Sequence, residues 1–219
     1  MIIGIDTATD AVAVAATTDG QVVFEARETS EAGGFPPHTS RLMPLVDEAA
    51  AKGGGRDRIE RIAVGTGPGS FTGLRIGLAA ARALGQGLGV PVVGVSSLEA
   101  LAAAAAGEYP QGVAAVIDAR RKQVFALAAS GEAPQVLDPG ELKPGDGPAV
   151  AVGDGAVRYR ETLTANGYTV PGDDSPLHGV NAAWICRLAE SGRAGAPDPV
   201  YLRQPDAAVW LARQAGESE

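Results

Sequence analysis

The stretch Ile62-Ala63-Val64-Gly65-Thr66-Gly67-Pro68-Gly69-Ser70 determines how the first half of the chain is interpreted. Three apolar residues typical of a buried strand lead into a turn with glycine at every second position. A helical pattern follows from about Thr72 to Leu88, and Gly87 and Gly89 at its end permit a left-handed cap. The stretch therefore predicts a strand, a glycine-rich loop and a long helix with one apolar face, made of Leu74, Leu78, Ala81 and Leu84.

The residues before this stretch predict three strands and a helix. The strands cover Ile2 to Thr7, Ala11 to Thr17 and Gln21 to Arg27, and the second and third are joined by a turn with an Asp-Gly pair that is typical of a hairpin. A helix is expected from Thr39, capped by Thr39 or Ser40 and ended by the glycines 53 to 55. Pro44 lies inside this pattern and should kink the helix or delay its start.

The residues after the stretch complete a small βββαβα lobe. Val90 to Val95 forms a strand, and Ser96 with Glu99 three residues later forms a capping box for an alanine-rich helix that ends near Ala106. We expect the segment from Ser30 to Pro37 to be irregular because it is rich in glycine and proline.

The second half of the chain repeats this plan loosely. Ala114 to Asp118 resembles the first strand, and Gln123 to Ala129 is its hairpin partner. Ala151 to Gly155 echoes the glycine stretch, with a helical pattern from Val157 to Thr164 behind it. A helix from Asn181 to Ser191 and a terminal stretch complete the chain. The repeat predicts an α/β protein of two related lobes, each a mixed sheet with helices, over residues 1–106 and 107–219, with a terminal helix or tail that packs back on the first lobe.

Composition excludes several classes of protein. The 219 residues carry 18 basic and 26 acidic side chains, a net charge of −8 that is unfavourable for gripping a nucleic acid unaided. The single cysteine, Cys186, allows neither an intrachain disulfide nor a thiolate zinc cluster. The chain opens without a basic segment, and its longest apolar run is far shorter than the ~20 residues of a membrane span. We therefore expect a cytoplasmic protein.

The glycine loop and the end of the first strand are the candidate ligand site. The loop precedes a helix N-terminus and could direct N–H groups at a phosphate, but it lacks the lysine of a Walker loop. A purely structural turn is about as well supported. Asp6 and Thr7 could hold a magnesium-bound nucleotide between the lobes, whereas capping of the hairpin backbone by Asp6 is the simpler interpretation. The candidate nucleotide residues are Asp6, Thr7, Gly65, Gly67, Gly69 and Ser70.

Other reactive side chains favour structural roles. Ser70 lacks the flanking pattern of a hydrolase nucleophile. His38 and His178 are far apart and in no metal-binding array, so no metal site is predicted. We expect His38 to begin a helix and His178 to be a solvated loop residue. Trp184 and Trp210 are best explained by packing.

The segment Gly65-Thr66-Gly67-Pro68-Gly69-Ser70-Phe71-Thr72-Gly73-Leu74-Arg75-Ile76-Gly77 resembles the bacterial TsaB (YeaZ) family, the accessory subunit of the tRNA threonylcarbamoyladenosine machinery. Further landmarks in the same order extend the resemblance over nearly the whole chain. They are Ile5-Asp6-Thr7, His38-Thr39-Ser40-Arg41-Leu42-Met43-Pro44, Asp118-Ala119-Arg120 and Pro199-Val200-Tyr201-Leu202-Arg203.

The resemblance implies a two-lobed actin-like, Hsp70-like ATPase (ASKHA) fold and a role as a non-catalytic scaffold. In the family, the catalytic relative TsaD carries the metal-binding histidines and a full nucleotide site, TsaB pairs with it, and the ATPase TsaE joins the assembly. The complex transfers a threonylcarbamoyl group to the adenosine beside the anticodon, forming N6-threonylcarbamoyladenosine (t6A). Contact with tRNA is expected only through the complex, no cofactor is firmly implied, and weak ATP or ADP binding is left open.

The resemblance also points to two helices as the docking surface for TsaD, and for a homodimer when TsaD is absent. We expect apolar and small residues on these helices to be exposed and to form a helical bundle with the partner. They are Leu42, Leu45 and Ala49 on the first helix and Leu74, Gly77, Leu78 and Ala81 on the second. Two rival functions remain: a nucleotide-hydrolysing or kinase-like enzyme of the same fold, and a glycoprotease-like metallopeptidase.

Overall fold

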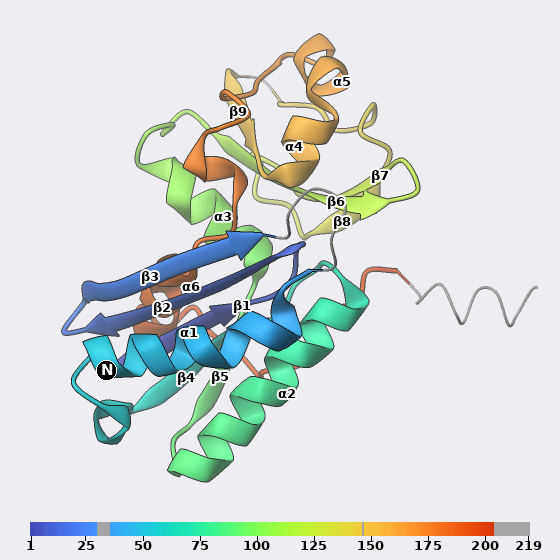
Figure 1. The fold of residues 1–219 in the computed structure, drawn as a ribbon. Helices are drawn as coiled ribbons and strands as arrows, with labels where there is room; N and C mark the ends of the chain where they lie inside the picture. The colour runs from blue at the N-terminus through green and yellow to red at the C-terminus, as the bar shows by residue number, and fades with distance from the viewer. Residues whose placement is uncertain (30–35, 146, 204–219) are drawn as a thin grey trace, which may run out of the picture.

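The computed structural model describes residues 1–29, 36–145 and 147–203, and the chain forms two lobes stacked along one axis (Figure 1). Each lobe is built on a five-stranded mixed sheet. The greater part of the predicted loop from Ser30 to Pro37, the tail after Arg203 and Trp210 lie outside the described residues. Within the described residues, no helix is both long and apolar enough to cross a bilayer.

The sheet of the first lobe has the order β3-β2-β1-β4-β5. The central strand β1 pairs antiparallel with β2 and parallel with β4. Every residue of β1 is buried because helices cover both faces of the sheet. The strands are β1 (Ile2–Asp6), β2 (Ala11–Thr18), β3 (Gln21–Thr29), β4 (Arg61–Gly65) and β5 (Val92–Val95).

The sheet of the second lobe repeats this order. Read from its other end it runs β8-β7-β6-β9-β10, so each strand has a counterpart in the first sheet. The repeated plan predicted from two weak sequence echoes is therefore confirmed. The strands are β6 (Val113–Arg120), β7 (Gln123–Leu127), β8 (Gln135–Leu137), β9 (Ala149–Val152) and β10 (Tyr168–Thr169), of which β8 and β10 were not predicted.

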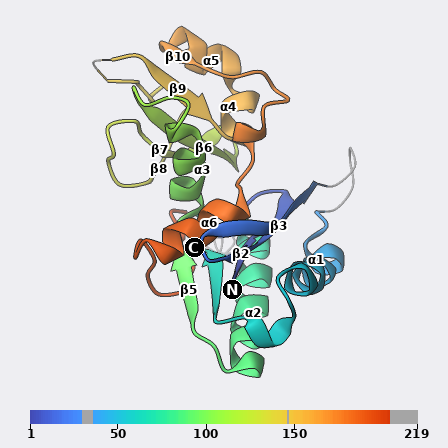
Figure 2. The same cartoon turned by 90° about the vertical axis from the view of Figure 1, so that its left-hand side faces the viewer.

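Three helices cover the first sheet. Helices α1 (His38–Lys52) and α2 (Phe71–Leu88) lie side by side on one face, and α6 (Ala182–Glu190) covers the other face (Figures 1 and 2). Helix α2 approaches its sheet closely because small residues line its inner face. They are Gly73, Gly77, Ala81 and Gly85, all buried.

Two helices exchange places between the halves of the sequence. Helix α3 (Ser97–Ala106) comes from the first half but packs on β6, β7 and β9 of the second sheet, whereas α6 comes from the second half and packs on the first sheet. Helices α3 and α6 also contact each other, and both belong to one apolar core that includes residues of both sheets. The lobes therefore share a core.

The predicted helices differ from the structure in three details. The helix predicted over Val157 to Thr164 is divided into α4 (Asp154–Arg158) and α5 (Arg160–Ala165), which cover the outer face of the second sheet. Helix α1 begins before Pro44, so the proline does not delay its start, and Thr39 and Ser40 lie inside the helix rather than capping it.

The Ser96 cap is confirmed, because its side chain accepts a hydrogen bond from the Glu99 N–H. Two 3₁₀ turns, η1 (Arg56–Arg58) and η2 (Pro176–His178), complete the elements.

Candidate functional site

A cleft of about 360 Å³ lies between the two lobes. Three parts of the chain form its walls: the turn after β1 with the N-terminus of α2, the end of β6 with the start of α4, and the segment from Val200 to Arg203. The cleft is lined by Ala8, Thr9, Asp10, Gly69, Ser70, Phe71, Thr72, Ile117, Asp118, Ala119, Arg120, Phe125, Asp154, Val200, Tyr201, Leu202 and Arg203.

The glycine loop is hydrogen-bonded into the first lobe. The Thr66 N–H donates to the Val95 carbonyl at 2.8 Å, the Gly67 N–H to the Ser97 hydroxyl at 3.2 Å, and the Ser70 N–H to the Ala8 carbonyl at 2.7 Å. The Ser70 side chain caps α2 by accepting from Gly73. These amides are already paired, so they do not form an open anion cradle of the kind a phosphate loop provides.

Asp6 and Thr7 point into the interior of the first lobe. Asp6 accepts hydrogen bonds from the Ala8 N–H at 2.9 Å and from the Ser97 hydroxyl at 2.5 Å. Its burial raises the pKa of its carboxyl, against the opposing effect of those two donors. The Thr7 hydroxyl donates to the Gly73 carbonyl at 2.8 Å.

Among the candidate nucleotide residues, only Gly69 and Ser70 line the cleft. A Cβ at Gly65 would overlap Asp6, and a Cβ at Gly69 would overlap the Ala8 carbonyl, so these glycines permit close backbone packing. The hairpin cap expected of Asp6 as the simpler interpretation is present in its bond to the Ala8 N–H. Binding of a nucleotide by these residues stays a prediction.

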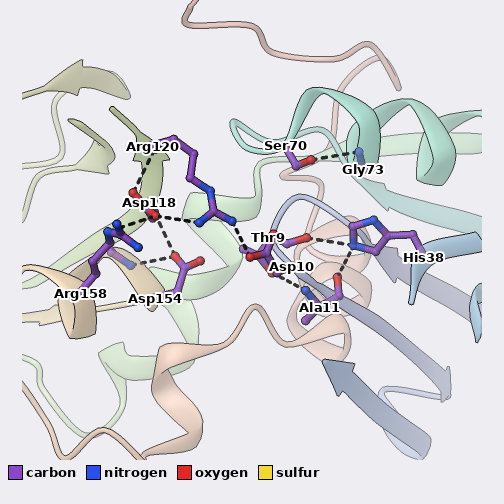
Figure 3. Close-up of polar contacts among 11 residues, drawn as sticks. Thr9, Asp10, Ala11, His38, Ser70, Gly73, Asp118, Arg120, Asp154 and Arg158 are labelled. Atoms are coloured by element: carbon purple, nitrogen blue, oxygen red, sulfur yellow. Dashed lines mark hydrogen bonds and ion pairs between the residues drawn. The ribbon is translucent and has the colours of Figure 1, made fainter. Parts of the chain in front are cut away.

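A chain of charged groups crosses the cleft (Figure 3). Arg120 at the end of β6 donates to Asp10 of the first lobe at 2.5 Å, and lies 3.5 Å from Asp118. Arg158 of α4 approaches the same Asp118 oxygen at 3.6 Å. The Asp118 side chain is only 7% exposed, whereas those of Asp10 and Arg120 are 55% and 57% exposed. The inner carboxylate is thus held by two guanidinium groups.

Asp154 is the most perturbed acid in the cleft. Its carboxylate accepts from the N–H groups of Asp118 at 3.1 Å and Gly155 at 2.8 Å. Burial raises its pKa from 3.8 to about 6, and the nearby charges of Asp118 and Asp10 act in the same direction. Asp10, Arg120 and Asp154 were not among the residues predicted from sequence. The only signals for them were the echo of the glycine stretch and the Asp118-Ala119-Arg120 landmark.

The aromatic rings of Phe71 and Tyr201 line another part of the cleft. The rings of Phe71 and Tyr201 lie 5.2 Å apart, and the Arg75 guanidinium stacks 3.8 Å from the centre of the Phe71 ring. The segment that carries Tyr201 is held in place by a hydrogen bond from the Val200 N–H to the Thr66 carbonyl. It is also held by Arg82 of α2, which pairs with Asp198 at 2.8 Å.

The residues predicted to face a partner are buried in the first lobe, which corrects the expectation that they are exposed. All seven pack with the sheet or the glycine loop of their own chain: Leu42, Leu45, Ala49, Leu74, Gly77, Leu78 and Ala81. Gly77 shows the reason, because a Cβ there would overlap the Thr7 hydroxyl. The small residues bring the helix onto its own sheet, and the apolar stripe faces inward.

The remaining reactive residues have internal partners. His38 begins α1, as expected, and its Nε2 lies 2.9 Å and 3.0 Å from the carbonyl oxygens of Thr9 and Ala11. His178 is buried in η2, not a solvated loop residue as expected, and its ring bonds Gly153 and the Pro171 carbonyl. The buried Cys186 thiol has its pKa raised to about 12, chiefly by burial. Among the described residues, no three His, Cys, Asp or Glu side chains are grouped to hold a metal ion.

Comparisons with known proteins give a consistent set of relatives. The family model described as TsaD, tRNA N6-adenosine threonylcarbamoyltransferase, matches residues 21–137. The tRNA threonylcarbamoyladenosine biosynthesis protein TsaB of Haemophilus influenzae is 36% identical over 57% of this chain and 51% of its own length. For TsaB of Escherichia coli the identity is 40%, over 57% of this chain and 52% of the relative. The matches thus span about half the length of these curated relatives.

Two further comparisons cover nearly the whole chain. An uncharacterized protein of Mycobacterium tuberculosis is 35% identical over 94% of this chain and 93% of its own length. The solved structure of YeaZ from Pseudomonas aeruginosa is 28% identical, with a TM-score of 0.74, over 92% of this chain and 99% of that chain. The two-lobed arrangement of mixed sheets is therefore shared with a solved relative over nearly all of its chain.

Proposed function

The chain belongs to the TsaB (YeaZ) branch of the TsaD family, and from this premise we propose that it is a non-catalytic partner of TsaD in forming t6A on tRNA. The names of the Haemophilus influenzae and Escherichia coli relatives support a role in that pathway. The match to nearly all of the solved YeaZ chain supports the same scaffold over 92% of this chain.

The observation that supports a non-catalytic role is that Asp6 and the glycine loop are hydrogen-bonded to other groups of their own chain. The Asp6 carboxylate is bonded to Ser97 and Ala8, and the glycine loop donates to carbonyl and hydroxyl groups of its own lobe. A nucleotide held by Asp6 or by the amides of Thr66 and Gly67 would have to break these bonds, and a buried polar group is costly to leave unpaired.

An ATPase assay with magnesium on the purified chain tests this part. We expect no turnover above the buffer rate. Sustained hydrolysis that follows the protein through a sizing column, and is lost in Asp6→Asn, would support the rival nucleotide-hydrolysing enzyme instead. A fold check by circular dichroism keeps loss of activity distinct from loss of structure.

The docking surface proposed for TsaD is the outward face of α1 and α2. The predicted residues are buried, but the same helices present other apolar side chains to solvent, and their inward faces are already occupied. Met43 of α1 is 39% exposed, and Ala79 and Ala83 of α2 are exposed with Ile76 and Ala80 half-buried beside them. Two adjacent helices of this length can supply the ~800 Å² per partner of a standard interface.

Copurification with TsaD tests this surface. Ala79→Glu combined with Ala83→Glu places two charges one turn apart on α2, and we expect association with TsaD to weaken by at least tenfold because the charges must be desolvated. The matched control is Ala165→Glu, an exposed helical alanine at the end of α5. Unchanged affinity in the α2 variant would show that TsaD docks elsewhere.

The same surface would pair two copies of the chain when TsaD is absent, and TsaE would join the larger assembly. Light scattering of the isolated chain should report a dimer that the Ala79→Glu, Ala83→Glu variant converts to a monomer. The isolated chain should bind tRNA weakly because a net charge of −8 offers little counterion release. Submicromolar binding at physiological salt would contradict that expectation.

A further inference from the structure

The turn between β6 and β7 holds three consecutive cations in an unfavourable backbone conformation. Arg120, Arg121 and Lys122 have φ values of +62°, +52° and +62°. Arg120 pairs with Gln123 across the hairpin, which makes Arg121 and Lys122 a two-residue turn. A turn with positive φ at both central positions favours Asn-Gly. Arginine and lysine are therefore conformationally unfavourable residues at these two positions.

The turn directly follows Arg120, which lines the cleft and is positioned by both lobes. The Arg120 guanidinium donates to Asp10, and the Arg120 backbone N–H donates to the Asp118 carboxylate at 2.9 Å. Arg121 and Lys122 follow directly and are exposed. The chain therefore places Arg120 in the cleft and two exposed cations directly after it, although its net charge is −8. Strained residues of this kind are commonly retained at functional sites.

Two aromatic rings, those of Phe71 and Tyr201, lie in a second wall of the same cleft, and an arginine lies beside them. Tyr201 is 42% exposed, and its ring contacts Phe71. Arg75 stacks on Phe71, with its Nε 3.5 Å from the Tyr201 hydroxyl. Exposed aromatic rings beside arginine provide stacking platforms for unpaired bases.

We propose that these two groups form an RNA-contacting surface, the basic rim, consisting of Phe71, Arg75, Arg120, Arg121, Lys122 and Tyr201. The cations would contact phosphates and Tyr201 would stack on an unpaired base. The proposal rests on the proposed function, because the RNA would be the tRNA held by the complex with TsaD. RNA fits better than an acidic protein because the rim combines the exposed Tyr201 ring with guanidinium groups, whereas an acidic face requires only charge.

The basic rim is suited to assist binding rather than to provide it alone. Asp10, Asp118 and Asp154 lie in the same cleft and offset part of its charge. Two or three phosphate contacts contribute a small part of the affinity and salt dependence of a whole RNA complex. The rim should therefore be detected as a change in the affinity of the complex.

The experiment measures binding of tRNA to the reconstituted complex with TsaD by fluorescence anisotropy at several salt concentrations. The main variant is Arg121→Asn with Lys122→Gly, which removes two cations and installs the sequence that the turn favours. We expect the melting temperature to stay equal or rise, the affinity to fall by roughly tenfold, and the salt slope to decrease by about 1 to 2. The charge-matched control is Lys52→Ala with Arg58→Ala, two exposed cations at the end of α1 and in η1.

A second pair of variants tests the stacking role. Tyr201→Ala should weaken tRNA binding by roughly tenfold, whereas Tyr201→Phe keeps the ring and should bind like the native complex. An RNA of fully paired bases should show no difference between the two.

The outcomes separate this proposal from the proposed function. If the native complex forms and binds tRNA but the rim variants bind equally well, the rim is wrong and the function stands. If the rim variants instead lose TsaD, the surface is a protein contact and the RNA proposal is overturned. If no complex forms, the proposed function fails, and tRNA binding by the isolated chain is measured at low salt instead. Binding by the native chain that is lost in the rim variants would still support the rim. Absence of binding by the native chain would refute it.

Discussion

The two central strands of the molecule, β1 and β6, end in the same local structure but use it differently. In each, an aspartate accepts a hydrogen bond from the N–H two residues later, at 2.9 Å: Ala8 to Asp6 in the first lobe and Arg120 to Asp118 in the second. The second oxygen of Asp6 meets the Ser97 hydroxyl in a closed interior. The corresponding oxygen of Asp118 faces two guanidinium groups in the cleft.

This difference shows that equivalent positions in two sheets of the same topology can have different chemical surroundings. Both sheets have the same strand order, so backbone geometry places the two aspartates equivalently. The neighbouring strand then decides the outcome: Gly65 at the end of β4 brings the backbone against Asp6, whereas Asp154 after β9 adds a second carboxylate near Asp118. The aspartate of the first lobe is thus bonded in a closed interior, whereas that of the second lies between two guanidinium groups in the cleft.

The largest expected effect comes from filling the space beside Asp6. In Gly65→Ala the added Cβ would overlap the Asp6 carboxylate and approach the Ser97 hydroxyl, so we expect a loss of about 3 kcal/mol or more in the free energy of unfolding. Denaturant titration measures it. Gly107→Ala is the control, because a Cβ there meets nothing within 4 Å.

A double variant sharpens that test. Removing the carboxylate in Asp6→Ala should make Gly65→Ala less costly than in the native background, with a coupling energy of about 1 to 3 kcal/mol. Strict additivity of the two changes would mean that the strain at Gly65 comes from another neighbour.

A smaller, pH-dependent effect is expected for Asp154. Its pKa is about 6 in the folded protein, against an ordinary value of 3.8, so the folded protein binds the proton more tightly and loses stability as pH rises between those values. Asp154→Asn removes this loss. The free energy of unfolding of the variant should equal that of the native chain below pH 4. Above pH 6 it should be higher by about 2 kcal/mol, a value reduced because the cleft is partly open to water.

Thermal or denaturant unfolding between pH 3.5 and 7.5 measures this difference. Asp57→Asn removes the same charge at an exposed position outside the cleft and should shift no such transition. A native chain whose stability relative to Asp154→Asn does not change with pH would show that the carboxyl titrates normally.

The smallest expected effect is that of the ion pair between the lobes. Asp10 and Arg120 are both more than half exposed, so Asp10→Ala should cost less than about 1 kcal/mol, and the cost should shrink further in 1 M salt. A loss above 2 kcal/mol that persists at high salt would mean that the pair is shielded from water and clamps the lobes.

The sequence predicted the strands and helices well where local pattern decides them. The hairpin turn at Asp19-Gly20, the Ser96 cap and the apolar face of α2 are local features, and each is present in the structure. The segment from Gly65 to Gly77 also indicates the family. Its glycines stand at fixed positions because a Cβ at each of them would overlap a neighbouring group.

The sequence could not reveal what lies across from each residue. The spacing of Gly77 and Ala81 is the same whether they face a partner helix or their own sheet. The contact of Gly77 with Thr7, which is seen only in the structure, shows that they face the sheet. The charged cleft was missed for the same reason, since Asp10 and Arg120 are 110 positions apart and meet only after both lobes have formed. The predicted lobe boundary at 106 and the nucleotide residues stay predictions.

The exchange of α3 and α6 has a consequence for how the chain can be divided. A fragment ending after Ala106 would carry a helix whose apolar face has no sheet to pack on, and its own sheet would lack the cover that α6 provides. The complementary fragment would have the reciprocal defect. Cleavage in the connection between α3 and β6 should therefore yield two pieces that aggregate when separate and reassemble when mixed, because each completes the interior of the other.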